Sequence, residues 1–397
     1  GLYRNVHLII TEDAYIPVWG TYITTPSVNE KFAKVNVRTK VVLPEGADPA
    51  KYSVETSVWN PNKQKLTAVR TSLAQMKYNN NQAEQEFVIQ APSLWSPEMP
   101  ALYSAETRLY EGDKLKDIYT TPFGIRSIEI IPDKGFFLNG KRTVFKGVCN
   151  HHDLGPLGAA VNDAAIRRQI RILKDMGCNA IRTSHNMPAP ELIRACDEMG
   201  MMIMAESFDE WNVAKCKNGY NLLFDEWAEK DLVNLLHNFR NNPSVVMWCI
   251  GNEVPNQWNE GDCKIAKWLQ DICHREDPTR PVTQGMDAPD AVVNNNFAAV
   301  MDVAGFNYRP FKYKINYKKL PQRIVLGSET ASTVSSRGVY KFPVERKAMA
   351  KYDDHQASSY DVEHCGWSNL PEDDFIQHED LPYCIGEFVW TGFGDFG

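Results

Sequence analysis

Two glutamates directly follow apolar runs that have the character of buried strands. Glu253 follows the run 245–252, and Glu329 follows the run 323–328. Carboxylates at the C-terminal ends of parallel strands lie at the rim where (β/α)₈ barrels carry their chemistry. Two carboxylates that face each other across such a rim are typical of glycoside hydrolysis. We expect Glu253 to protonate the leaving oxygen and Glu329 to attack the anomeric carbon, and a separation of about 5 to 5.5 Å would mean a retaining mechanism.

Three polar residues at strand ends are candidates to support this pair. Arg182 is expected to pair with the nucleophile and keep it ionised, with a purely structural salt bridge as the alternative. Tyr308 can donate its hydroxyl to the same carboxylate, or it can simply be a packed tyrosine. Asn252, next to the proposed acid, is expected to hydrogen-bond a sugar hydroxyl as charge develops.

Histidines and a tryptophan can complete a sugar subsite. His151, His152 and His185 follow the first two expected barrel strands, and each can bond sugar hydroxyls. A metal site built from these histidines is less favoured because their spacing matches no common ligand motif. Trp390 ends the last expected strand and can offer a ring face to a pyranose, with a core position as the alternative.

Other groups rank lower as candidates. Glu387 is a rival carboxylate within the last strand, and a nucleophile pair formed by Cys149 and His151 is disfavoured because residues two apart on a strand rarely make the needed hydrogen bond. Polar subsite contacts can also come from the segment after the third strand, namely Glu206, Asp209, Glu210 and Trp211.

The elements that must position these residues divide the chain in two. Residues 1–121 alternate polar and apolar side chains with turn-rich gaps, which predicts a β-sandwich of immunoglobulin-like size. From residue 122 to 397 short apolar strands alternate with helical segments, which predicts a (β/α)₈ barrel. Strands are expected at 144–149, 179–184, 201–206, 245–251, 281–284, 302–307, 323–328 and 383–390. Helices are expected near 163–176, 189–199, 224–240 and 262–275.

Three local features refine this division. The Asn139-Gly140 step predicts a tight hairpin before the barrel. The segment 341–382 is expected to be an elaborated active-site loop with some helix. The chain stops at Gly397 with no room for an eighth helix, so we expect the barrel to be incomplete at its C-terminus.

Bulk composition excludes several classes of function. The chain has 397 residues and a net charge of −7, so it has no electrostatic signature of nucleic-acid binding. No apolar run approaches the roughly 18 residues that span a bilayer, so no membrane partner is expected. The nine cysteines show no paired ligand spacing and are expected to be reduced core residues. We expect a soluble protein, cytoplasmic or periplasmic, and the sequence does not assign the compartment.

Several motifs together resemble glycoside hydrolase family 2, which contains β-galactosidases, β-glucuronidases and β-mannosidases. The resemblance rests on the segments 94–98, 137–141, 147–153, 181–185 and 250–253. It implies that Glu253 is the acid/base and Glu329 the nucleophile. It also implies that residues 1–10 are the exit from a missing jelly-roll sugar-binding domain. The tail 394–397 departs from the family pattern. The matching sugar-subsite positions are Arg182, His185, Asn252, Tyr308 and Trp390.

These observations lead to one expected function and several alternatives. We expect a retaining exo-glycosidase that releases terminal β-D-galactose from an oligosaccharide or glycoside. β-Glucuronidase or β-mannosidase activity is the alternative within the family, and a non-catalytic carbohydrate-binding protein is the alternative from another class. The mechanism requires no cofactor and no metal is assigned, although an accessory cation and a homo-oligomer are both compatible with the sequence.

Overall fold

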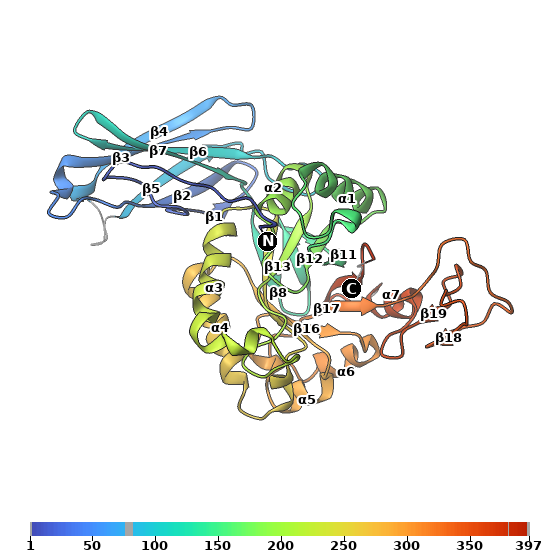
Figure 1. The fold of residues 1–397 in the computed structure, drawn as a ribbon. Coiled ribbons are helices and arrows are strands. Elements are labelled where there is room, and N and C mark those ends of the chain that lie inside the picture. Colours follow the sequence, from blue (N-terminus) through green and yellow to red (C-terminus); the bar gives the residue numbers. More distant parts are fainter. Residues whose placement is uncertain (1, 76–81, 380, 395–397) are drawn as a thin grey trace.

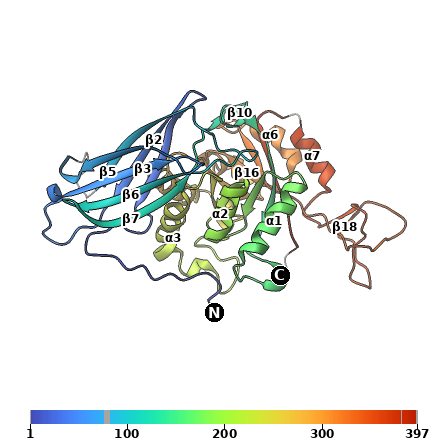
Figure 2. The same cartoon turned by 90° about the horizontal axis from the view of Figure 1, so that it is seen from above.

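The computed structural model describes residues 2–75, 82–379 and 381–394. Its N-terminal part is a β-sandwich and its C-terminal part is a closed barrel (Figure 1). The sandwich stands to one side of the barrel, and an arm formed by the chain after strand β17 projects from the other side (Figure 2). This arrangement matches the predicted order of a sandwich followed by a barrel.

The sandwich consists of two antiparallel sheets with strand orders β1-β2-β5 and β4-β3-β6-β7. Alternate residues of β2, β5 and β6 are buried, because successive side chains point to opposite faces of a sheet. The inward side chains include Val35, Val58 and Phe87, which form one apolar core. The strands are β1 Thr21–Val28, β2 Phe32–Lys40, β3 Tyr52–Trp59, β4 Lys65–Ser72, β5 Gln82–Gln90, β6 Tyr103–Glu111 and β7 Lys114–Phe123.

A small sheet links the sandwich to the barrel. It has the order β10-β9-β8, formed by β8 Ile128–Ile131, β9 Gly135–Leu138 and β10 Lys141–Thr143. Asn139 and Gly140 connect β9 and β10 with φ angles of 53° and 73°. Two positive φ values are those of the tight turn that this dipeptide predicts. We propose that the domain boundary lies between β7 and this sheet.

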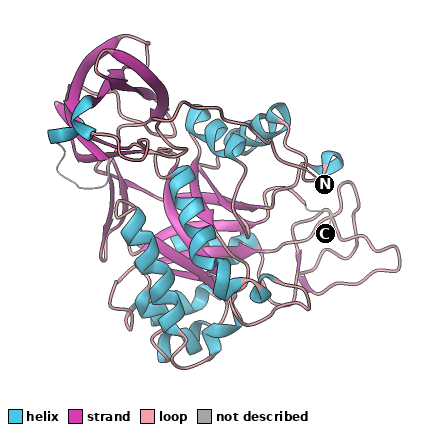
Figure 3. Cartoon of the chain, turned by 60° about the vertical axis from the view of Figure 1, so that its left-hand side comes forward, coloured by secondary structure: helices cyan, strands magenta, loops and turns pink. Residues whose placement is uncertain are grey.

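Eight parallel strands close the barrel, and each lies within two or three residues of its predicted position. They are β11 Phe145–Asn150, β12 Ala180–Thr183, β13 Met202–Glu206, β14 Val245–Asn252, β15 Val282–Met286, β16 Ala304–Asn307, β17 Val325–Ala331 and β20 Cys384–Trp390. Most of their residues are buried, because the barrel interior is packed and helices cover the outside (Figure 3). The C-terminal ends of the strands therefore form one polar rim.

A helix follows each strand from β11 to β17. The helices are α1 Asp163–Asp175, α2 Pro190–Met199, α3 Phe224–Phe239, α4 Cys263–Glu276, α5 Pro289–Asn294, α6 Tyr313–Tyr317 and α7 Pro371–Glu379. The long helices α1 to α4 were predicted, whereas α5 and α6 were not, since five or six residues are too few to display a helical period. The predicted active-site loop contains α7 and two short strands, β18 Lys347–Ala348 and β19 Glu363–His364.

Buried polar contacts fasten the sandwich to the barrel. The indole of Trp95 is fully buried and donates to the carbonyl of Asp197 in α2 at 2.9 Å. Arg126 donates to the carbonyls of Pro243 and Val245, at the start of β14. Asn241 bonds the backbone of β1 in both directions. These contacts satisfy backbone groups that the interface would otherwise bury unpaired.

The seam that closes the barrel depends on Gly386. This glycine has φ of +114°, and a Cβ built there would lie 2.2 Å from the carbonyl oxygen of Phe145 in β11. We expect Gly386→Ala to destabilise the protein by about 3 kcal/mol or more, because neither the backbone nor the neighbouring strand accommodates a side chain. Thermal unfolding of the intact protein measures this.

The matched control is Gly112→Ala, which has φ of +58° but no atom within 4 Å of the added Cβ. This control substitution should lower the free energy of unfolding by about 1 kcal/mol, because of the backbone conformation alone. Equal destabilisation by the two variants would contradict the assignment of β20 as a tightly packed closing strand.

Candidate active site

The two glutamates lie at the same rim of the barrel, on strands that β15 and β16 separate. Glu253 directly follows β14, and its amide donates to the carbonyl of Gly285 at 2.8 Å. Glu329 lies within β17 and is 6% exposed. Glu253 has φ of +42°, a value that non-glycine residues rarely adopt. This local geometry turns the chain off the strand immediately at the carboxylate.

Arg182 of β12 is the centre of the polar network. Its guanidinium is fully buried, and its closest side-chain partners are the carboxylate oxygens of Glu206 at 2.5 Å and Glu329 at 3.0 Å and the amide oxygen of Asn252 at 2.8 Å. It also donates to the carbonyl of Ser328 at 2.8 Å. A planar guanidinium can satisfy several acceptors at fixed angles, which a lysine cannot do. Arg182 therefore orients the Glu329 carboxylate and neutralises much of its charge.

Tyr308 holds the other oxygen of Glu329. It follows β16, and its hydroxyl donates to Oε1 of Glu329 at 2.7 Å and lies 2.8 Å from the hydroxyl of Ser332. Burial and the charge of Glu329 raise the pKa of Tyr308 well above its usual range, so it remains a hydrogen-bond donor. With Arg182 on one oxygen and Tyr308 on the other, the carboxylate of Glu329 is fixed in one orientation.

Asn307 joins the two halves of the site. Its amide nitrogen donates to Oε1 of Glu253 and to Oδ1 of Asn252, both at 2.9 Å. The hydroxyl of Ser328 donates to its amide oxygen at 2.7 Å, which fixes the orientation of the amide. The sequence analysis assigned no role to Asn307. Its place at the end of a strand, immediately before Tyr308, is the signal that could have identified it.

The two carboxyl groups differ in their electrostatic surroundings. Burial, with smaller contributions from the negative charges of Glu329 and Asp287, raises the pKa of Glu253 to about 7. The hydrogen bond from Asn307 only partly opposes this shift. Glu329 instead has a guanidinium and a phenol as direct partners. The site can thus present one carboxylic acid and one carboxylate near neutral pH, which is the combination that acid-assisted displacement needs.

His185 and Trp390 form one wall of the rim. Nδ1 of His185 lies 2.8 Å from Glu206, and its ring is stacked on Trp390 with centroids 5.4 Å apart. Burial would raise the pKa of Glu206, but Arg182 and His185 outweigh it and hold that pKa below its usual value. The ring of His151 meets both His185 and Trp390 edge-on.

The structure does not bring His152 to this wall. Its Nε2 lies 2.8 Å from the carbonyl of Ala159, and its ring packs near Tyr3. His151, which was predicted as a candidate together with His152, lies at this wall instead. The physical reason is strand alternation: Cys149 points into the barrel, so His151 two residues later continues on the same side.

The lower-ranked residues after β13 separate into two groups. Glu206 binds Arg182, and Asp209 accepts from Asn252 at 3.2 Å, so both belong to the network. Glu210 accepts the backbone amides of Lys215 and Asn221, and Trp211 donates to the carbonyl of Ile250. The second group therefore holds the loop in place.

The rival nucleophiles have other surroundings than the two rim glutamates. Cys149 is fully buried, and burial raises the pKa of its thiol to about 12, so it is not a thiolate at neutral pH. Glu387 accepts from Thr330 at 2.6 Å and faces His378 of α7, away from Arg182. None of the nine cysteines, all in the described part of the chain, forms a disulfide.

The residues that the structure describes hold neither a cluster of metal ligands nor a membrane-spanning helix. In the ranges 2–75, 82–379 and 381–394, no group of three or more His, Cys, Asp or Glu side chains could hold a metal ion. No helix in those ranges is long and apolar enough to cross a bilayer.

Comparison with known proteins places this geometry in a family. The model described as "Glycosyl hydrolases family 2, TIM barrel domain" matches residues 129–396, and "Glycosyl hydrolases family 2" matches residues 15–126. The chain is 36% identical to a β-galactosidase of Bacteroides ovatus, over 100% of this chain and 51% of that protein. It is 28% identical to a β-glucuronidase of Bacteroides fragilis, over 100% of this chain and 57% of that protein.

A solved structure agrees with these matches. It is a glycosyl hydrolase family 2 member from Bacteroides cellulosilyticus, with a TM-score of 0.81 and 32% identity, covering 96% of this chain and 44% of that one. The chain spans about half the length of the curated relatives named above. The resemblance inferred from the sequence motifs is confirmed: the chain belongs to glycoside hydrolase family 2.

Proposed function

We propose that the chain carries the active site of a retaining β-glycosidase that releases a terminal β-D-galactose. The observation that carries the proposal is the contrast between Glu253 and Glu329 across one rim. Glu253 has a pKa raised to about 7, whereas Glu329 is bound by Arg182 and Tyr308. Such a contrast separates the roles of acid and nucleophile.

The reaction then takes two steps. Glu253 donates its proton to the glycosidic oxygen while a carboxylate oxygen of Glu329 attacks the anomeric carbon, so the bond to the leaving group breaks and a glycosyl ester forms. Glu253, now ionised, takes a proton from water, and that water attacks the same carbon and releases Glu329. The two carboxyl groups suffice for both steps, so the mechanism requires no cofactor.

The remaining rim residues are proposed to bind the sugar. The ring of Trp390 can cover the apolar face of a pyranose, and Asn252 and His185 offer polar atoms beside Glu329. His151 replaces His152 in this set because its ring contacts Trp390. Arg182 is proposed to position the nucleophile, since its donors are already engaged by protein acceptors.

Galactosides are the proposed substrates, and the similarity to the Bacteroides ovatus β-galactosidase supports this choice. β-Glucuronides are the second candidate, because other relatives carry that name. A glucuronide brings a carboxylate that needs a cationic partner. Arg182 is fully engaged, and Lys215 is paired with Asp209 at 2.7 Å. These pairings favour a neutral sugar.

We therefore expect kcat/KM of the intact protein to be at least about 100-fold higher for 4-nitrophenyl β-galactoside than for the β-glucuronide, because an unpaired buried carboxylate is strongly penalised. Steady-state kinetics on both substrates measures this ratio. Glu329→Gln is the control, and its loss of activity on both substrates would assign turnover to this site. A preference for the glucuronide would overturn the galactoside proposal while leaving the two-carboxylate mechanism intact.

The pH dependence of kcat/KM tests the role of Glu253. Only the protonated acid can assist the leaving group, so activity should fall as the pH rises through about 7. Asp287 carries a negative charge that raises the pKa of Glu253, and Asp287→Asn removes this charge. The pKa of Glu253 should therefore fall, and the alkaline limb of the pH profile of kcat/KM should move to lower pH. We expect activity at pH 7 to fall by about twofold.

Asp290→Asn is the matched control for this experiment. Asp290 is exposed, lies three residues further along and pairs with Lys312 at 2.9 Å. Its substitution should leave the alkaline limb in place. If Asp287→Asn leaves the alkaline limb of the pH profile unchanged, or moves it to higher pH, the assignment of Glu253 as the acid is contradicted.

A further inference from the structure

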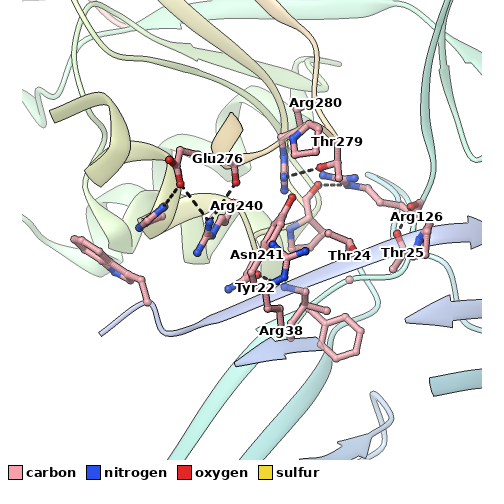
Figure 4. Close-up of a pocket in the computed structure, with 18 of the residues that line it drawn as sticks. Tyr22, Thr24, Thr25, Arg38, Arg126, Arg240, Asn241, Glu276, Thr279 and Arg280 are labelled. Atoms are coloured by element: carbon pink, nitrogen blue, oxygen red, sulfur yellow. Dashed lines mark hydrogen bonds and ion pairs between the residues drawn. The ribbon is translucent and has the colours of Figure 1, made fainter. Parts of the chain in front are cut away.

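A large hollow lies between the sandwich and the end of the barrel opposite the catalytic rim. Its volume is about 1020 Å³. One wall comes from β1 and β2, and the other comes from the C-terminal ends of α3 and α4 and the segments that lead into β14 and β15 (Figure 4). Glu253 directly follows the opposite end of β14, and Glu329 lies toward the C-terminal end of β17. We call this hollow the basic groove.

Positive side chains dominate the walls of the basic groove. Two acidic residues, Glu129 and Glu276, also line it, together with His237. The whole chain has a net charge of −7, so the positive charge here is a local feature. The six cationic lining residues are Arg38, Lys40, Arg126, Arg240, Arg275 and Arg280.

Arg126 is buried beside another cation. It is 8% exposed and donates to the uncharged carbonyls of Pro243 at 2.6 Å and Val245 at 2.7 Å. Arg280 donates to the same Val245 carbonyl at 2.6 Å. Burial, with a further contribution from Arg280, lowers the pKa of Arg126 to about 9. A buried charge is costly without an opposite charge, so an anion in the groove would be stabilising here.

The nearby carboxylates are shared among several cations. Glu276 lies 2.7 Å from His237, 2.7 Å from Arg275 and 4.0 Å from Arg240. Arg280 pairs with Asp277, and Arg275 also pairs with Glu229. The carbonyls at the ends of α3 and α4 offset part of the remaining positive charge.

Arg240 shows that this compensation is incomplete. Its guanidinium lies over the ring of Tyr22 at 4.4 Å, and burial lowers its pKa. Among the described residues its Nε atom is buried without a hydrogen-bond partner. Figure 4 shows Arg240 and Arg280 on the barrel side and Arg38 on the sandwich side of the groove. Cations therefore face the space from both walls.

We propose that the basic groove binds an acidic oligosaccharide, whose carboxylate or sulfate groups are held by arginines of both domains. The volume is that of a site for several sugar units, since ligand sites commonly measure about 300 to 1,000 Å³ and a single inorganic anion needs far less. Guanidinium groups bind carboxylate and sulfate oxygens in pairs. Trp19 also lines the groove and can cover a sugar face, while Thr24 adds a hydroxyl.

Calorimetric titration of the intact protein tests this proposal. The probes are hexagalacturonate, its methyl ester, which has the same backbone without charge, and a sulfated carrageenan hexaose. We expect at least one acidic probe to bind about 10-fold or more tighter than the methyl ester, and the comparison of the two distinguishes carboxylate from sulfate. Glu329→Gln should bind the acidic probe unchanged, because the catalytic rim is a separate site.

Variants of β2 locate the binding. Arg38→Gln combined with Lys40→Gln should weaken binding about 10-fold, since two cations of the sandwich wall are removed. Lys31→Gln combined with Lys34→Gln removes the same charge from positions outside the groove, one exposed and one half-buried, and should change binding by less than about twofold. If the double variant of Arg38 and Lys40 does not fold, the single variant Lys40→Glu replaces it in the same titration.

Three outcomes would overturn the proposal. One is that neither acidic probe binds the intact protein. Another is that both double variants weaken binding equally, which would mean diffuse attraction without a defined site. The third is that inorganic sulfate at the same concentration of charge displaces the oligosaccharide completely, which would make the groove a site for a small anion.

Discussion

The catalytic rim depends on one buried guanidinium. Arg182 has no exposed surface, and its hydrogen bonds reach four strands of the barrel, because Glu206, Asn252 and Glu329 lie on β13, β14 and β17 while Arg182 itself lies on β12. Burying this charge is costly unless every donor is satisfied, so the surrounding acceptors must keep their positions. The same contacts that compensate Arg182 thereby orient Glu329, and the closed barrel is what holds the four strands in register.

The two carboxyl groups have different surroundings within the same barrel. Among the residues that the structure describes, no cation forms an ion pair with Glu253, and burial raises its pKa to about 7. Asn307 connects the two environments, since its amide contacts both Glu253 and the Asn252 that binds Arg182. The proposed division into acid and nucleophile therefore rests on the burial of Glu253, which raises its pKa, and on the direct contact of Glu329 with the guanidinium of Arg182.

Much of this arrangement could be predicted from the sequence, for identifiable physical reasons. Barrel strands are short apolar runs that end in polar residues, so β14 and β17, and with them Glu253 and Glu329, were located directly. The helices α5 and α6 have too few residues to show a period, and Asn307 carries no signal beyond its position. His151 and His152 were both predicted as sugar-binding candidates, and the strand alternation that Cys149 sets places His151 beside Trp390. The basic groove brings together residues from β2, α3 and α4, and only tertiary packing reveals such a site.

Trapping the covalent intermediate tests the central claim most directly. The intact protein would be incubated with 2-deoxy-2-fluoro-β-galactosyl fluoride, in which the fluorine slows breakdown of the glycosyl ester, and then analysed by intact mass and peptide mapping. The account predicts one added glycosyl group, located on Glu329. An adduct on another residue would contradict it, and so would turnover of galactosides without any adduct. An adduct on Glu329 formed only by the glucuronyl analogue would keep the nucleophile and change the substrate.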